Sequence, residues 1–393
     1  MKKIIALFLC CCTVVSFAGC SKKNEETQLP TDAWAVEVQP IARSAYFADN
    51  VCKLLPKDEN YVYSPLSVRV AFAMVANGAQ AETKAELLSA LNISDLEAYN
   101  TKIKMLMEAY DEEKSIELHV ANSLWIRSGV GEISNAYADR MHTYYDATVA
   151  VVTPENAVHE INAWASKHTN GKIREIATNR DFEFFLANAT YMKADWETPF
   201  RASDTHKKLF QNIDGTTVKT DFMYQKSYFE YGECDGIQIL KMPYLTDGAD
   251  ISMYVLLGEK VAEYPQAILE KASFTTEEVV IYLPKFEQEV TLGLNEILQS
   301  LGAVRAFSNS TAQIQGILET TPLYVENSIQ KSYICIDEKG TEAAAVTAVD
   351  MGAMSVRPEK EPIVFEANRP FVYIIRDNAN GEILFMGQYV KVK

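Results

Sequence analysis

The stretch from Glu338 to Arg357 reads EKGTEAAAVTAVDMGAMSVR, and small uncharged residues dominate it. Successive side chains of a strand point to opposite faces, so this stretch would have one uncharged face as a strand. That face consists of Thr341, Ala343, Ala345, Thr347, Val349 and Met351. Glu342 and Asp350 fall on the other face, in reach of water. Gly340 stands at an expected turn, because glycine adopts unusual backbone angles at little cost. The stretch suits a loop that can also enter a sheet.

The segment from Glu338 to Ala345 resembles the hinge of the reactive loop of inhibitory serpins. Four further segments resemble serpin signatures in the same order as in that family. They are Asn60–Ser67, Asn188–Trp196, Leu283–Phe286 and Asn368–Phe371. The resemblance implies an α+β serpin fold with about nine helices around about three β-sheets, and an exposed reactive-centre loop over about 338–362. The hinge residues would be Glu338, Gly340, Thr341, Glu342, Ala343, Ala344 and Ala345.

Length and charge fit this interpretation. The chain has 393 residues with 37 basic and 53 acidic side chains, and its formal net charge is −16. Neither a linker nor a repeat interrupts it after Trp34, so we expect one large domain over 34–393. The acidic excess argues against nucleic acid as a partner.

The N-terminus has the pattern of an export signal. Positive residues at Lys2 and Lys3 precede an apolar core, Ile4–Phe17, and small residues precede Cys20. This pattern predicts a signal peptide over 1–19 rather than a membrane span. It resembles a bacterial lipoprotein signal, which implies a lipid on Cys20 and a flexible tether over 20–33. We expect an exported protein, anchored to a membrane in the periplasm or at the cell surface. The alternative is an ordinary secretory signal and an extracellular protein.

Cysteine spacing gives no metal motif. Cys52, Cys234 and Cys335 remain beyond the signal, far apart in the chain. We interpret them as small buried apolar residues, while a bond from Cys234 to Cys52 or to Cys335 stays open. We expect no metal and no cofactor, because no Cys-x-x-Cys or mixed Cys/His spacing occurs.

Catalytic motifs of enzymes are also missing from the sequence. His159-Glu160 lacks the second histidine of a zinc-protease motif, and no Gly-x-Ser-x-Gly or phosphate-binding loop occurs. A triad assembled from distant residues stays open. We expect an inhibitor rather than an enzyme.

Counting along the resemblance implies that the reactive bond is Met354–Ser355. Methionine is a flexible apolar side chain that fills a medium-sized pocket, which implies an elastase- or chymotrypsin-like serine protease as the target. Cysteine proteases are a second target class. Met351 and Arg357 are alternative bait residues, and Arg357 is the poorer because Pro358 lacks an N–H.

The resemblance implies two supporting sites. At the breach, where the loop enters the main sheet, Glu338 would pair with Lys285 near Trp196. The alternative is an isolated surface pair, which would contribute little stability. The second site is a polar cluster under the point where the sheet opens, called the shutter: Ser64, Ser67, Asn188 and Gln330. The family commonly has a histidine where this chain has Gln330, so we expect no pH sensitivity there.

The resemblance also implies a mechanism. Before cleavage, the main sheet would have a gap between the strand at Phe184 and the strand at Leu323. Cleavage would free the loop to fill that gap as a central strand and drag the acyl-enzyme with it. The uncharged hinge favours such an irreversible inhibitor, expected as a monomer. A non-inhibitory binding or carrier protein on the same scaffold is the alternative.

Periodicity predicts the individual elements. Helices are expected over 33–55, from Ser64, and over 80–91, 94–110, 133–145, 156–169, 264–271 and 294–301. Strands are expected over 116–126, 148–152, 184–192, 278–292 with a break at Pro284, 323–337, 371–376 and 383–390.

Overall fold

A computed structural model describes residues 44–318, 323–341 and 361–392. The chain divides into two units, Met1–Val38 and Gln39–Lys393, and the described residues all belong to the second. The expected signal peptide and tether therefore lie outside the described part. So do the following predicted site residues: Cys20, Glu342, Ala343, Ala344, Ala345, Met351, Met354, Ser355 and Arg357.

Eight α-helices and three short 3₁₀-helices occur in the described part, where about nine helices were expected. The α-helices are α1 Phe47–Cys52, α2 Pro65–Gly78, α3 Ala81–Ala90, α4 Leu96–Glu112, α5 Asn135–Tyr145, α6 Ala157–His168, α7 Pro265–Lys271 and α8 Asn295–Ser300. The 3₁₀-helices are η1 Ala202–Asp204, η2 Val261–Glu263 and η3 Arg305–Phe307. Helix α2 begins as predicted, because the Ser64 hydroxyl accepts a hydrogen bond from the Ser67 amide at 3.1 Å and Pro65 occupies the first turn.

The strands are β1 Tyr61–Tyr63, β2 Ile116–Arg127, β3 Thr148–Val152, β4 Phe184–Asp195, β5 His206–Gln211, β6 Thr217–Cys234, β7 Ile237–Pro243, β8 Ile251–Leu257, β9 Phe274–Pro284, β10 Phe286–Gly293, β11 Asn327–Ile336, β12 Gly340–Thr341, β13 Ile363–Glu366, β14 Phe371–Asp377 and β15 Ile383–Tyr389. In the described ranges they form two hydrogen-bonded sheets, of nine and six strands, rather than three. The reason is β6, which spans 18 residues and pairs with β5, β7 and β9, so that one continuous strand joins them.

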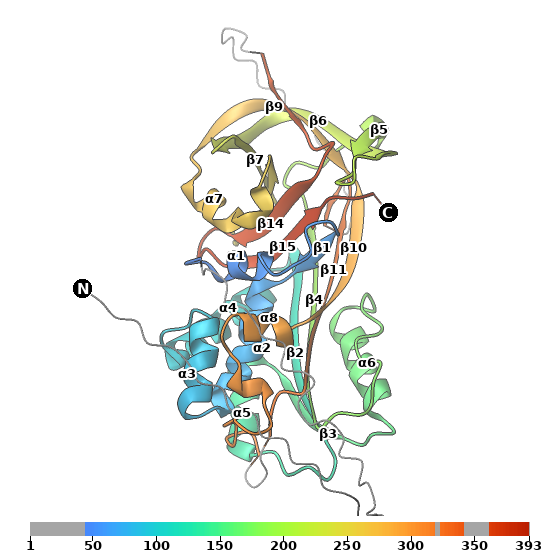
Figure 1. The fold of residues 1–393 in the computed structure, drawn as a ribbon. Helices are drawn as coiled ribbons and strands as arrows, with labels where there is room; N and C mark the ends of the chain where they lie inside the picture. Colours follow the sequence, from blue (N-terminus) through green and yellow to red (C-terminus); the bar gives the residue numbers. More distant parts are fainter. Residues whose placement is uncertain (1–43, 319–322, 342–360, 393) are drawn as a thin grey trace, which may run out of the picture. The chain divides into compact units, whose positions relative to one another are not determined.

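The six-stranded sheet has the order β10-β11-β12-β4-β2-β3 and is covered on both faces. Figure 1 shows α6 on one side of it and α2, α3, α5 and α8 on the other. Residues under α6 form a separate apolar cluster that includes Trp125, Trp164 and Tyr191. Burial from both sides explains why β4 is nearly continuous in apolar residues.

The prediction of a gap between the strand at Phe184 and the strand at Leu323 is wrong over most of their length. Strands β4 and β11 pair directly and in parallel over seven residue pairs, from Phe185 opposite Asn327 to Tyr191 opposite Tyr333. Beyond this point β12 lies between them, antiparallel to both, with Thr341 opposite Ala194 and also opposite Ile336. Strands β4 and β11 are therefore paired directly over residues 185–191 and 327–333, and beyond them the sheet already contains Gly340 and Thr341 of the hinge.

Candidate functional site

Among the described hinge residues, Gly340 and Thr341 lie in the sheet, and Thr341 contacts the core. Its side chain is fully buried, and its hydroxyl shares a hydrogen bond of 2.7 Å with the hydroxyl of Tyr244. Burial raises the pKa of Tyr244 above its ordinary value, so this phenol stays protonated. The contact fixes the face of the sheet to which Thr341 points. In a strand continued from Thr341, every second residue would point the same way.

Gly340 is required at this position by a close approach between backbones. A Cβ atom there would lie 2.0 Å from the carbonyl oxygen of Ala194 and 2.7 Å from the Cα of Asp195. The predicted turn is also present, because the Asp337 amide donates to the Gly340 carbonyl at 3.0 Å. The Asp337 carboxylate accepts from the Lys339 amide at 2.9 Å. Only glycine allows this turn to lead into the sheet beside β4.

Trp196 anchors the same turn from β4. Its indole Nε1 donates to the carbonyl of Asp337 at 3.0 Å, and its backbone amide donates to the carbonyl of Lys339 at 2.6 Å. The indole stacks on Tyr244 with 4.6 Å between ring centroids and 12° between planes. Tyr244 therefore contacts both the breach tryptophan and the hinge, a role that the sequence analysis missed.

The structure places Glu338 against Lys285 at the base of the loop. Lys285 Nζ lies 2.6 Å from Glu338 Oε2, and the Thr205 hydroxyl donates to Oε1 at 2.7 Å. The Phe200 amide donates to the Glu338 carbonyl at 2.7 Å. Burial opposes ionisation of Glu338, but the hydrogen bonds from Lys285 and Thr205 outweigh it and lower its pKa. Glu338 is nearly buried, whereas the Lys285 side chain is 38% exposed. The hydrogen bonds from Thr205 and Phe200 make this pair part of a cluster rather than an isolated surface pair.

The four shutter residues are fully buried and lie together. Gln330 accepts from the Ser64 amide at 2.9 Å, and its Nε2 donates to the Ser64 carbonyl at 3.1 Å and to Asn188 Oδ1 at 2.7 Å. Asn188 Nδ2 donates to the Ser67 hydroxyl and to Asn122 Oδ1, the latter at 2.7 Å. Gln330 thus uses its carbonyl oxygen and its amide nitrogen in the network.

Asn122 extends this network across three strands and was not predicted. It lies opposite Asn188, which in turn lies opposite Gln330, so the three amides form a row across β2, β4 and β11. The available signal was that Asn122 is the one polar residue among the alternate positions 116, 118, 120, 122, 124 and 126 of β2, which share one face of the strand. The three side chains and both serines carry no ionisable group, so the network itself does not titrate.

A second polar pair joins β4 to β11 one step further along the same face. The hydroxyl of Thr190 donates to the hydroxyl of Ser332 at 2.7 Å, and both residues are fully buried. On the opposite face the rings of Tyr191 and Tyr333 lie 6.1 Å apart. A strand that enters between β4 and β11 must separate each of these pairs.

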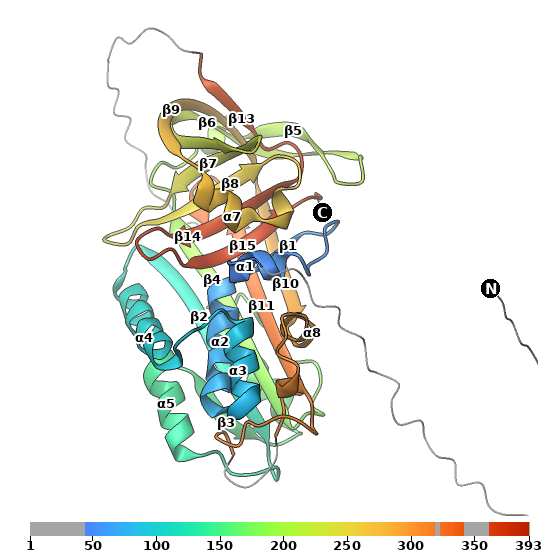
Figure 2. The same ribbon diagram turned by 60° about the vertical axis from the view of Figure 1, so that its left-hand side comes forward.

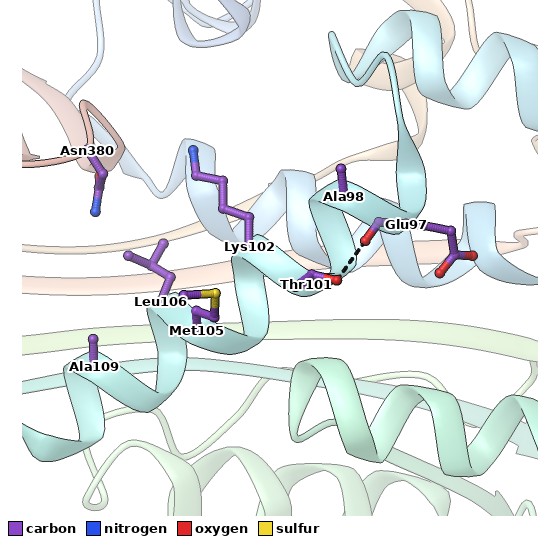
Figure 3. Close-up of a pocket in the computed structure, with 8 residues that line it drawn as sticks. All are labelled: Glu97, Ala98, Thr101, Lys102, Met105, Leu106, Ala109 and Asn380. Atoms are coloured by element: carbon purple, nitrogen blue, oxygen red, sulfur yellow. Dashed lines mark hydrogen bonds between the residues drawn. The ribbon is translucent and has the colours of Figure 1, made fainter.

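A surface hollow of about 710 Å³ lies along α4 (Figure 3). It is lined by Glu97, Ala98, Thr101, Lys102, Met105, Leu106, Ala109 and Asn380. All but Asn380 project from one helix, and the Met105 side chain is 65% exposed. Carrier sites normally enclose most of the ligand surface, which this hollow does not do.

Cys52 and Cys234 are free thiols. Cys52 is buried, with its sulfur 3.1 Å from the sulfur of Met386, whereas Cys234 and Cys335 are only partly buried, contrary to expectation. Among the described residues no cluster of His, Cys, Asp and Glu could hold a metal ion. No helix in the same ranges is long and apolar enough to cross a membrane.

Comparison with known proteins identifies the family. Residues 43–392 match the family model described as Serpin (serine protease inhibitor). The chain is 31% identical to Serpin-Z10 of Arabidopsis thaliana, over 86% of this chain and 93% of the relative. It is 32% identical to an uncharacterized serpin-like protein of Thermococcus kodakarensis, over 93% and 90% of the two chains. The crystal structure of the thermophilic serpin tengpin in the native state matches with a TM-score of 0.79 at 29% identity, covering 90% and 97%.

The chain therefore belongs to the serpin family and has the serpin fold. Members of this family are typically protease inhibitors rather than enzymes.

Proposed function

We propose that this chain is an irreversible suicide-substrate inhibitor of elastase- or chymotrypsin-like serine endopeptidases. A protease cuts at about Met354–Ser355, and the freed loop enters the six-stranded sheet before the acyl-enzyme is hydrolysed. One observation carries this proposal: Gly340 and Thr341 already lie between β4 and β11, antiparallel to both. The continuation of the hinge therefore has a defined position to enter.

The geometry of the two strands supports insertion. The parallel pairing of β4 with β11 would be replaced by two antiparallel ladders, one on each side of the new strand. Each ladder adds hydrogen bonds that an exposed loop lacks. About 14 residues at about 3.3 Å each would carry the bound protease roughly 45 Å, which would distort its active site.

The orientation of Thr341 supports the proposal that the uncharged face of the loop would point into the core after insertion. Thr341 points to Tyr244 in the core, so Ala343 and Ala345 would follow on that face without burying a charge. Glu342 would fall on the opposite face. The carrier alternative gains no support from the open hollow along α4.

The N-terminal pattern supports a location for this activity. A lipid on Cys20 would hold the inhibitor at a membrane, in the periplasm or at the cell surface, as a monomer on the tether 20–33. Cys20→Ala should then release the protein from membrane fractions. Membrane association that survives this change would reject the anchor and favour another mode of attachment.

The experiment that tests the proposed function mixes the protein with pancreatic elastase or chymotrypsin. Denaturing gels and intact mass should show a covalent complex and a released fragment that begins at Ser355. Cleavage without a complex, but with a higher melting temperature of the cut form, would mean that the loop inserts too slowly for that enzyme. Cleavage without a complex and without a higher melting temperature would contradict the inhibitor proposal.

A further inference from the structure

The outer face of β6, β9 and β13 carries an aromatic patch. These strands lie side by side at one end of the nine-stranded sheet (Figures 1 and 2). Tyr224 lies opposite Tyr282, and Val280 lies opposite Val364. Tyr228 lies opposite Glu278, on the same face of the sheet. We call Tyr224, Tyr228, Val280, Tyr282 and Val364 the tyrosine face. Tyr228 is 67% exposed and Val364 is 54% exposed.

The tyrosine face is aromatic and locally balanced in charge. The rings of Tyr224 and Tyr282 lie 5.3 Å apart, and Lys208 Nζ lies 3.4 Å above the Tyr282 ring. The nearby lysines are paired with acids: Lys208 contacts Glu366 at 2.6 Å, and Lys226 contacts Glu278 at 3.2 Å. A patch of this kind attracts a partner through apolar and aromatic contact rather than through net charge.

Packing of the domain accounts for Tyr282, which lies against the core, but not for the exposed Tyr228 and Val364. The inward positions of β9, which are Val279, Ile281 and Leu283, are fully buried and supply its core contacts. The outward positions of a sheet that faces water are normally polar. Within the described part of the chain, none of the phenol oxygens of Tyr224, Tyr228 and Tyr282 has a hydrogen-bond partner. These groups are free to bind another molecule, and tyrosine is enriched among the residues that dominate interface energies.

We propose that the tyrosine face docks the body of the target protease while the protease holds the reactive loop. This inference rests on the proposed function and adds a second determinant of specificity to it. Strand β13 begins at Ile363, about nine residues after Met354, and nine residues span at most about 30 Å. A protease of about 230 residues has a radius of gyration of about 17 Å and is therefore roughly 45 Å across.

An enzyme whose active site holds Met354 thus lies within its own width of the tyrosine face. The part of the enzyme that it meets is the rim of the substrate cleft. We infer an uncharged rim with apolar or arginine side chains, because those groups pack on tyrosine rings. Binding should accordingly depend little on salt, since the patch has no net charge to screen.

The test measures docking separately from trapping. The probes are pancreatic elastase and chymotrypsin in which the nucleophilic serine is replaced by alanine, so that they bind the loop and cannot cut it. The Tyr228→Ala/Val364→Ser double variant should raise the dissociation constant about tenfold or more for at least one of them. Met105→Ala is the matched control, because it removes an equally exposed apolar side chain from α4. The control should bind within about twofold of the unchanged protein, and both variants should keep its melting temperature.

Each outcome decides one claim. If the double variant binds both inactive enzymes as the unchanged protein does, the docking inference is overturned, whether or not the active enzymes are trapped. An equal loss in Met105→Ala would also overturn it, because the effect would then not be specific to the tyrosine face. Failure of the active enzymes to form covalent complexes would count against the proposed inhibition alone. In the trapping assay the double variant should form complexes more slowly, with an unchanged ratio of complex to cleaved inhibitor.

Discussion

The hydroxyl of Tyr244 lies 2.7 Å from the hydroxyl of Thr341, in a buried contact between residues 97 positions apart in the chain. This hydrogen bond joins Tyr244, the residue that follows β7, to Thr341 of the hinge. It holds β12 between β4 and β11. Trp196 stacks on the same tyrosine and binds the turn before the hinge, so one aromatic pair supports both ends of the short strand.

The first prediction concerns this hydrogen bond. Tyr244→Phe should lower the free energy of unfolding by about 1 kcal/mol and release β12, because the buried Thr341 hydroxyl loses its partner. Hydrogen exchange at the Gly340 and Thr341 amides should become faster. Thr341→Val alone and the double variant complete a thermodynamic cycle. A coupling energy near zero between the two positions would mean that the contact does not hold the hinge.

Gly340→Ala should disturb the breach more strongly. The added methyl group would overlap the carbonyl of Ala194, so either β12 leaves the sheet or β4 shifts, at a cost of about 1–3 kcal/mol. Gly293→Ala is the matched control, since no atom lies within 4 Å of a Cβ built there. Thermal unfolding of both variants measures the difference. Equal melting temperatures would show that the close approach at Gly340 is not needed.

Insertion itself is tested by a charge on either face of the hinge. Thr341→Arg and Ala343→Arg should convert the inhibitor into a substrate, because a buried charge opposes strand entry. Glu342→Arg adds the same charge on the opposite face, where a continued strand would place it beside the partly exposed Lys193 and Cys335, and should leave trapping largely intact. The measure is the fraction of protease recovered as a covalent complex. Similar fractions for Ala343→Arg and Glu342→Arg would exclude face-specific insertion.

Several of these residues could be predicted from the sequence because their signals are local. The local sequence predicted β3 at its observed bounds, 148–152. The Ser64-Pro65 pair predicted the start of α2. The resemblance to serpins pointed to Lys285 and Glu338 as partners. In each case a pattern within a few residues, or a family motif, carried the information.

The missed residues depend on which strands become neighbours. Thr190 and Ser332 are 142 positions apart, and they meet only because β4 and β11 pair in parallel in one register. The same pairing closes the expected gap, and the pairing of β2 with β4 brings Asn122 into the shutter row. Alternation within one strand defines its faces but leaves the neighbour and the register open.

The breach pair should make stability depend on acid pH. Burial opposes the charge on Glu338, but Lys285 and Thr205 lower its pKa on balance, so its contribution is present at neutral pH and is lost as pH falls below about 4. Glu338→Gln should therefore reduce stability at pH 7 and have less effect near pH 3. Denaturant unfolding across this range measures the difference. A constant difference between the two proteins would show that the Glu338 pKa is not shifted by folding.

The shutter, unlike the breach pair, should contribute a stability that does not vary with pH, because its amides and serines do not titrate between pH 5 and 8. Replacing the fully buried Gln330 by histidine introduces a group that burial keeps neutral in the folded state, with a pKa below its unfolded value of about 6.5. The unfolded state then binds more protons, so Gln330→His should lose stability as pH falls from 8 to 5 relative to the unchanged protein. Gln330→Leu separates this effect from the loss of the hydrogen bonds to Ser64 and Asn188, since its cost should not vary with pH. A Gln330→His variant whose relative stability is constant over this range would show that the site admits water or a counter-charge, although Gln330 itself is fully buried.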